Sequence, residues 1–378
     1  MYEKGNSLVE IHHRNSQTDV LPRFQKVLSN LSSSNLSSYK KSIIRDAIGE
    51  ILGEVTPEKG FPIFSLHSYN LEEISKLDDQ SIPNYLFYRY RYDTFPKKLK
   101  LDSFPPCLQI EPTSICNYRC LFCYQIDEEF TNKNNGMMGM MSLEVFKRII
   151  DECENEIEAV TLASRGEPLI CPDIEEMLKY VSGKFLALKL NTNAWFLDEN
   201  KSHIILDSGI NNIVFSADAA SEPTYSRLRV NGKLDRVYKN IKRFHEIRNK
   251  YYPNSKIITR ISGVQFPGAD SLVDMKKFWS DFVDQVAFVK YNPWENTYCQ
   301  PVNNISDPCS DLWRRMFIWW DGKVNPCDID FKSHLCIGNI TQSSLSDLWR
   351  SSKYSELRES HRSENRAKCS PCNQCSFI

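Results

Sequence analysis

The sequence predicts an α/β protein built on a sheet of parallel strands. The first observation is that, from Pro105 onward, short apolar segments alternate with longer amphipathic segments. The second is that strands joined by helical crossovers lie parallel to one another. Ligands of such sheets bind beyond the carboxyl ends of the strands, so functional residues are expected at that edge.

The alternation resolves into six strands and five helices. The predicted strands span residues 107–111, 159–163, 187–191, 212–217, 257–263 and 285–289. The predicted helices span residues 142–154, 172–183, 198–208, 234–250 and 270–282. Ser142 and Asp198 are suited to cap helix N-termini, and Gly183 and Gly209 are suited to end helices.

Composition and charge narrow the class of protein. The chain has 378 residues, a formal net charge of −1 and 13 cysteines. The charge gives no general reason to expect nucleic acid, and no segment has the roughly 18 apolar residues of a membrane span. The first residues, Met1 to Asn6, lack the apolar core of a secretory signal. Many cysteines without an export signal favour metal binding in a reducing compartment, so we expect a cytoplasmic protein.

Residues 1–100 read as an amino-terminal extension of unknown role. Helix-like pieces at 20–28 and 39–52 flank a segment rich in Ser and Asn, which predicts a mainly helical region. The aromatic run at 85–92 could form a basic platform for a nucleic acid or a sugar. We instead expect its rings to pack on a neighbouring domain.

Three cysteines carry the strongest chemical signal. Cys116, Cys120 and Cys123 have the spacing C-x3-C-x2-C. Structural zinc and an all-cysteine cubane both need four ligands, so three thiolates on one loop suggest a [4Fe–4S] cluster with one iron left open. The alternatives are a zinc loop or three unrelated buried thiols.

This loop resembles that of the radical S-adenosylmethionine (SAM) superfamily. The resemblance covers about residues 105–289 and implies a core at 101–295 folded as a partial (β/α)6 barrel of parallel strands. It also implies that SAM chelates the open iron exchangeably. Electron transfer from the cluster then cleaves SAM to a 5′-deoxyadenosyl radical.

Further motifs match the superfamily one at a time. Phe122 occupies an aromatic position that the resemblance places near the adenine. Gly166 and Glu167 look like its glycine–glutamate motif, in which the glutamate receives the SAM ammonium group, although Arg165 stands where a glycine is usual. The pair at 192–193 follows the third strand, where helix capping explains it nearly as well.

The fourth and fifth strands add further candidates. By the same resemblance Ser216 contacts the ribose or carboxylate of SAM, and Arg229 pairs with the carboxylate. Asp218 either joins that site or caps the following helix. Residues 260–264 are expected behind the adenine.

A second group of cysteines lies in residues 296–378. Asp321-Gly322 is a tight-turn signal, which places Cys327 on the return strand of a hairpin. The pattern resembles the SPASM and twitch domains, which carry auxiliary [4Fe–4S] clusters, and implies one such cluster in a small hairpin-plus-helix domain. Five cysteines compete for its four positions, and a zinc ribbon is the alternative. The candidates are Cys309, Cys327, Cys369, Cys372 and Cys375.

Together these features predict a radical SAM enzyme of the oxidoreductase type. An electron-accepting auxiliary cluster would make the reaction a two-electron oxidation, for which a sugar or other small molecule is the expected substrate. A peptide-modifying enzyme is the first alternative, and a non-catalytic iron–sulfur carrier or scaffold is the second. The expected partner is a reductant such as flavodoxin or ferredoxin, with no membrane and no clear nucleic acid. No residue stands out as the catalytic base.

Overall fold

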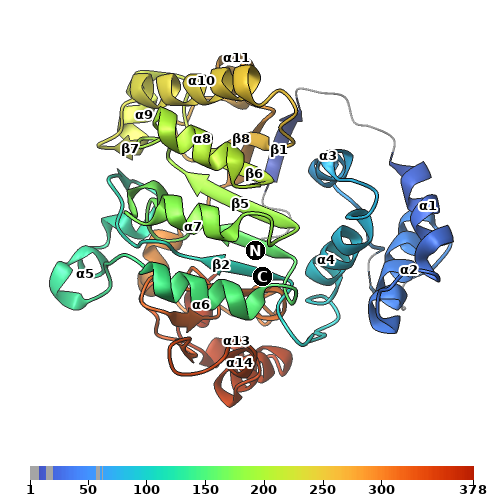
Figure 1. Cartoon of the computed structure of the whole chain (residues 1–378). Coiled ribbons are helices and arrows are strands. Elements are labelled where there is room, and N and C mark those ends of the chain that lie inside the picture. Colours follow the sequence, from blue (N-terminus) through green and yellow to red (C-terminus); the bar gives the residue numbers. More distant parts are fainter. Residues whose placement is uncertain (1–7, 14–19, 57–59, 62) are drawn as a thin grey trace.

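The computed structural model describes residues 8–13, 20–56, 60–61 and 63–378 (Figure 1). Met1 to Asn6, the segment without a secretory signal, lie outside the described residues. None of the helices in the described part of the chain combines the length and the apolarity that crossing a bilayer requires.

The core of the molecule is a parallel sheet, as predicted. Six strands lie in the order β9-β8-β6-β5-β4-β2, and each pairs in parallel with its neighbour. Their bounds are β2 (Cys107–Ile110), β4 (Ala159–Leu162), β5 (Ala187–Thr192), β6 (Asn212–Ser216), β8 (Ile258–Gln265) and β9 (Gln285–Lys290). The predicted α/β class is confirmed, with strand ends that differ from the predicted ones by one or two residues.

Helices between these strands cover the outer face of the sheet (Figure 1). Their bounds are α6 (Leu143–Cys153), α7 (Ile174–Val181), α8 (Glu199–Asp207), α9 (Glu222–Leu228), α10 (Leu234–Tyr251) and α11 (Leu272–Trp279). Ser142 and Asp198 accept hydrogen bonds from the amides of Val145 and Lys201, so both predicted caps are confirmed. Gly183 and Gly209 follow the ends of α7 and α8 with φ of 73° and 71°, a conformation that suits glycine.

Side chains on the strands alternate between two environments. Leu108, Val160 and Leu188 are fully buried in the apolar layer beneath the helices. Their neighbours Gln109, Thr161 and Lys189, which are register partners across β2, β4 and β5, line an internal cavity. Polar side chains of these strands are therefore turned to the inside of the barrel, whereas the side chains under the helices are apolar.

The amino-terminal extension closes the end of the barrel where the strands begin. Its helices are α1 (Leu21–Leu31), α2 (Ser38–Leu52), α3 (Ser68–Lys76) and α4 (Ile82–Thr94), which gather on one side of the sheet in Figure 1. The aromatic run forms most of α4, and its buried rings share an apolar cluster with Cys107, Ala159 and Ala187, the first residues of their strands. The prediction that these rings pack on a neighbouring part of the chain is confirmed.

Polar contacts reinforce this closure. Gln285 donates to Glu72 over 2.6 Å, and Asn212 donates to Glu73 over 3.1 Å. Strand β1 (Leu8–His13) pairs antiparallel with β9 and so covers that edge of the sheet. Helices of the extension thus contact the first residues of several strands at once.

The carboxy-terminal region continues the core sheet. Strand β10 (Arg315–Ile318) pairs in parallel with β2, and β11 (Lys323–Asn325) and β12 (Gly338–Asn339) follow it. Among the described residues the sheet therefore has ten strands. The remaining elements are β3 (Arg119–Cys120), β7 (Arg229–Val230), α5 (Glu128–Thr131), α12 (Asp311–Arg314), α13 (Leu345–Trp349) and α14 (Ser352–Arg362).

The predicted hairpin is present, with one correction. Gly322 has φ of 81° in the tight turn between β10 and β11. Cys327, however, was predicted on the return strand and instead follows Pro326 beyond the end of β11. The proline lacks an amide proton, so it cannot extend the ladder at that point.

Arg91 on α4 provides a test of the closure. Its side chain is 2% exposed and lies 2.9 Å from Glu158 and 2.7 Å from Asp102. We expect Arg91→Met to lower the free energy of unfolding by about 1.5–3 kcal/mol, because it removes charge-assisted contacts from two carboxylates that keep Lys40 and the Tyr39 hydroxyl among their side-chain partners. Urea unfolding under anaerobic conditions measures this loss.

The matched control is Arg148→Met. Arg148 forms an exposed ion pair with Glu152, with side chains 46% and 26% exposed, so the loss should stay below about 1 kcal/mol. Equal losses in the two variants would mean that α4 does not depend on its buried ion pairs.

Candidate active site

The cysteine triad lies at the carboxyl end of the barrel. Cys116, Cys120 and Cys123 follow β2 and border an internal cavity of about 350 Å³. The loop is held by the short pairing of β3 with β7 and by a hydrogen bond from the Cys123 amide to the Cys120 carbonyl. The structure therefore brings the three predicted thiols to one cavity wall.

The surroundings of these thiols fit a cluster. Burial raises the pKa of all three thiols, that of Cys123 to about 12, so a positive metal centre is needed to hold them as thiolates. The Tyr118 amide donates to the Cys116 sulfur over 3.4 Å, and Arg229 lies 3.5 Å from the Cys120 sulfur. Such donors stabilise sulfur that carries negative charge.

The spacing of the ligands bears on the zinc alternative. In the described part of the chain, no three His, Cys, Asp or Glu side chains are close enough together to hold a single ion. A cubane binds each thiolate at a different iron, so its ligands stand farther apart than those of one zinc ion. A zinc ion and a cluster therefore differ in the spacing of the sulfur ligands that they require.

Gly166 explains how the loop after β4 approaches the cysteine loop. A Cβ at this position would lie 2.3 Å from the carbonyl oxygen of Thr113 and 2.6 Å from that of Ile115. The next amide, that of Glu167, donates to the Ile115 carbonyl over 2.9 Å. Only glycine allows the two backbones to lie this close.

Glu167 is a buried carboxylate at the wall of the same cavity. It is 2% exposed and accepts hydrogen bonds from Thr192 and from the amide of Asn193, each over 2.6 Å. Burial raises its pKa to about 6, although these hydrogen bonds act in the opposite direction. The pair at 192–193, ambiguous in the sequence, thus orients Glu167.

Arg229 has a protein partner that the sequence did not indicate. It forms a buried ion pair with Asp218, and its guanidinium lies 5.4 Å from the centre of the Phe122 ring. Asp218 also accepts from the Val264 amide over 2.7 Å. The N-cap of α9 is Ser221, so the helix-capping alternative for Asp218 is wrong.

Other predicted residues line the same cavity. Phe122 is buried against Phe266, with ring centroids 5.6 Å apart, and Ser216 lies at the end of β6. Of the segment at 260–264, Ser262 and Val264 border the cavity. The contacts of Phe122, Gly166, Glu167, Ser216 and Arg229 with SAM itself stay predictions.

Arg165, which departs from the usual glycine, has a structural role that the sequence did not reveal. Its guanidinium donates to both carboxylate oxygens of Glu111, over 2.6 and 2.7 Å. It also donates to the Phe331 carbonyl over 2.8 Å and lies 4.2 Å from the centre of the Trp319 ring. A buried acid directly after β2 is the signal that could have indicated a buried cation nearby.

The carboxy-terminal cysteines gather around a second, small apolar cavity. Four of the five candidates border it, whereas Cys369 is outside this lining. Arg366 holds the last turn by donating to the carbonyls of Cys372 and Cys375. The structure brings together Cys309, Cys327, Cys372 and Cys375.

His361 supplies an independent test of whether a cluster fits there. The Cys309 amide donates to its Nδ1 over 3.2 Å, and burial lowers its pKa to about 3, so the neutral ring carries its proton on Nε2. That buried Nε2 borders the cavity without a hydrogen-bond partner. A cluster offers sulfur acceptors at this place, so the site fits the group.

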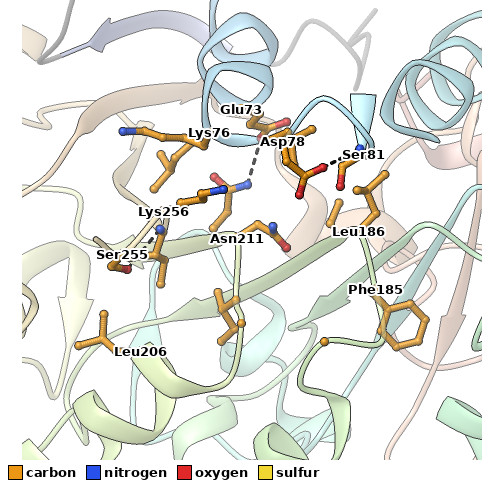
Figure 2. Close-up of a pocket in the computed structure, with 18 of the residues that line it drawn as sticks. Glu73, Lys76, Asp78, Ser81, Phe185, Leu186, Leu206, Asn211, Ser255 and Lys256 are labelled. Carbon is orange, nitrogen blue, oxygen red and sulfur yellow. Dashed lines mark hydrogen bonds between the residues drawn. The ribbon is translucent and has the colours of Figure 1, made fainter. Parts of the chain in front are cut away.

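A larger cavity of about 700 Å³ lies at the opposite end of the barrel (Figure 2). Glu73, Lys76 and Asp78 line it from α3 and the loop after it, and face Asn211 and Lys256 in the segments before β6 and β8. Its lining contains no cysteine. The cavity at the carboxyl ends of the strands is therefore the better candidate for chemistry.

Comparison with known families and proteins agrees with this geometry. Residues 110–264 match the family model described as "Radical SAM superfamily", and residues 309–376 match that of SPASM, described as "Iron-sulfur cluster-binding domain". The tungsten-containing aldehyde ferredoxin oxidoreductase cofactor-modifying protein of Pyrococcus furiosus is 22% identical over 326 residues, which cover 72% of this chain and 89% of that protein.

Two further likenesses extend over most of the chain. The S-adenosyl-L-methionine-dependent 2-deoxy-scyllo-inosamine dehydrogenase of Niallia circulans is 20% identical over 286 residues, which cover 74% of this chain and 95% of that protein. The crystal structure of Streptococcus suis SuiB bound to S-adenosylmethionine has a TM-score of 0.53 at 17% identity and covers 91% of this chain and 84% of its own. At this identity the structural likeness bears on the fold.

The four-cysteine lining makes a prediction about iron content. Wild-type protein should hold about eight irons per chain, the sum of two four-iron clusters. Cys372→Ser should hold only about four, because it removes a ligand, whereas Cys369→Ser should keep about eight. Iron and zinc analysis of the anaerobically reconstituted variants measures this difference. Loss of iron from Cys369→Ser, together with full iron in Cys372→Ser, would show that Cys369 is the ligand and Cys372 is not.

Proposed function

The chain belongs to the radical SAM superfamily and carries a SPASM domain behind its radical SAM domain, and on that premise we propose that it catalyses a two-electron oxidation of a sugar or other small molecule. The observation that carries this proposal is the internal cavity shared by the cysteine triad and by polar residues from six strands of the sheet. When bound, the cluster and SAM supply a 5′-deoxyadenosyl radical that can abstract hydrogen from a substrate.

The chain's own residues would bind and orient the reactants. We assign Cys116, Cys120 and Cys123 to the first cluster and the carboxylate of Glu167 to the SAM ammonium group. Arg229 is already paired with Asp218, so it would present its remaining N–H groups to a carboxylate. Ser216 and Phe122 line the cavity wall and would contact the ribose and the adenine. The buried walls keep water away from reactive species.

A small substrate is supported by the closure of the barrel. Helix α4 covers the end where the strands begin, so the cavity does not continue as a channel through that end of the barrel. This chain is similar over most of its length to the dehydrogenase of Niallia circulans. The name of that enzyme gives 2-deoxy-scyllo-inosamine, a small molecule, as its substrate. An oxidation also gives the second cysteine site a purpose, since its cluster could accept the second electron.

Peptide modification is the second candidate. The observation in its favour is that the likeness to SuiB covers 91% of this chain and so includes much of the amino-terminal extension. Against it stands the position of that extension, which packs on the amino ends of the strands, away from the cysteine triad.

The state of the cysteines bears on the cellular compartment of the protein. All 13 cysteines lie in the described residues and none forms a disulfide, which suits a reducing compartment such as the cytoplasm. A small reductant such as flavodoxin or ferredoxin would supply electrons.

Cleavage of SAM tests the assignment directly. Reconstituted protein with dithionite should convert SAM to 5′-deoxyadenosine and methionine, and the Cys116→Ala, Cys120→Ala, Cys123→Ala triple variant should not. Sugars and cyclitols should raise the yield and be oxidised in equal amount, as chromatography and mass spectrometry would measure. Stimulation by peptides alone would favour the second candidate, and absence of cleavage would favour a non-catalytic carrier.

The pKa of Glu167 makes a prediction about pH. Its folded pKa of about 6 lies above its ordinary value, so the carboxylate is protonated below that pH and can no longer attract an ammonium group. SAM affinity should therefore fall about tenfold for each pH unit below 6 in the wild type. Glu167→Gln should bind SAM weakly and lose this dependence, and the exposed Glu128→Gln should behave as wild type in equilibrium dialysis. If SAM affinity still falls below pH 6 in Glu167→Gln, a group other than Glu167 causes the pH dependence.

A further inference from the structure

Two cations of the barrel interior have no part in the site described above. Lys189 lies on β5, in register with Thr161 of β4, and Arg315 begins β10, in register with Cys107 of β2. Both side chains border the cavity that also contains the cysteine triad. Because Arg315 begins its strand and Lys189 lies midway along β5, they lie deeper in the barrel than the cysteine loop.

Neither cation forms an ion pair in the part of the chain that the structure describes. Among the described residues, no carboxylate lies within 4 Å of the charged atoms of Lys189 or Arg315, and the buried Nε of Arg315 has no hydrogen bond. Arg315 instead lies 5.2 Å from the centre of the Tyr92 ring, a contact made by α4. A cation on an aromatic face keeps its N–H groups available for another ligand.

The carboxylates around the cavity are already engaged. Glu167 accepts from Thr192 and Asn193, and Asp218 pairs with Arg229. Asp328 borders the cavity as well, and the charges of Tyr92, Asp311 and Asp328 raise the pKa of Arg315 well above its ordinary value, against the effect of burial. Lys189 and Arg315 therefore contribute two positive charges to the cavity lining that no carboxylate of that lining pairs with at ion-pair distance.

The charge of Lys189 is costly without a ligand, whereas that of Arg315 is stabilised by its surroundings. Burial, and then the nearby charge of Arg315, lower the pKa of Lys189 to about 8, as expected for an ammonium group without a counter-ion. A buried cation without an ion pair in a cavity is typical of binding sites, because a ligand of opposite charge removes the cost of burying it.

We propose that Lys189 and Arg315 form an anion-binding floor that takes a phosphate or carboxylate group of the substrate. The forked guanidinium suits either oxyanion, and the ammonium group adds a point charge. Gln109 and Thr161, which border the same cavity, can donate further hydrogen bonds. This role in a reaction rests on the proposed function. A substrate whose anionic group is bound at the floor would extend from there toward the cysteine triad.

Binding of simple anions tests this floor without any turnover. Calorimetry on the reconstituted protein would use inorganic phosphate and acetate as probes and glycerol as the uncharged comparison. At least one anion should bind saturably, and the identity of that anion distinguishes a phosphate from a carboxylate substrate. Lys189→Met and Arg315→Met should each weaken this binding about tenfold or more. Lys189→Arg should retain most of it.

The matched control is Lys179→Met, which removes an exposed cation of α7 and should leave anion binding unchanged. Lys189→Met should also raise the melting temperature without anion, because it removes an unpaired charge, so loss of binding cannot be attributed to unfolding. Absence of saturable binding by both anions, or unchanged binding in both Met variants, would overturn the proposal. Anion binding by a protein that never cleaves SAM would overturn the proposed function and leave the floor intact.

Discussion

The buried ion pair between Glu111 and Arg165 holds the active-site end of the barrel together. Glu111 directly follows the first core strand, and Arg165 lies in the loop that also contains Gly166 and Glu167. The same pair contacts the carboxy-terminal region, since Arg165 donates to the Phe331 carbonyl and Glu111 accepts from the Trp320 amide. Removal of either partner would leave the other charged and buried, at a cost of about 3–5 kcal/mol. The ion pair therefore fixes the cysteine loop, the glutamate loop and the second metal region relative to one another.

The two ends of the barrel differ in packing: one is filled with side chains and the other contains a cavity. Where the strands begin, aromatic rings of α4 and buried ion pairs close the structure. Where they end, glycine and short polar residues leave space, and buried Glu167 and Arg229 keep their charges by hydrogen bonds and pairing. The result is a cavity with the three cysteines of the triad on one wall and buried side chains around it, which would limit the contact of a reactive species with water.

Local patterns in the sequence predicted most of the core, and contacts between distant segments account for what was missed. The strand and helix alternation, the caps at Ser142 and Asp198, and the cysteine spacings are all encoded within a few residues. The pairing of β10 with β2 and of β1 with β9 joins segments far apart in the chain, so no local period indicates it. For the same reason, the partners of Arg165 and Arg229 were visible only in three dimensions. The choice among the last three cysteines also needed the fold, because their spacing treats them alike.

The parallel pairing of β2 with β10 has a consequence for how the protein is made. About two hundred residues separate the two strands, so during synthesis β2 is produced long before its outer neighbour. Until β10 emerges from the ribosome, one side of β2 is an open edge with unpaired backbone groups, able to recruit other strands. The first strand of the core therefore completes its pairing only after the last quarter of the chain has been synthesised. We expect nascent chains of this protein to need chaperones during that interval.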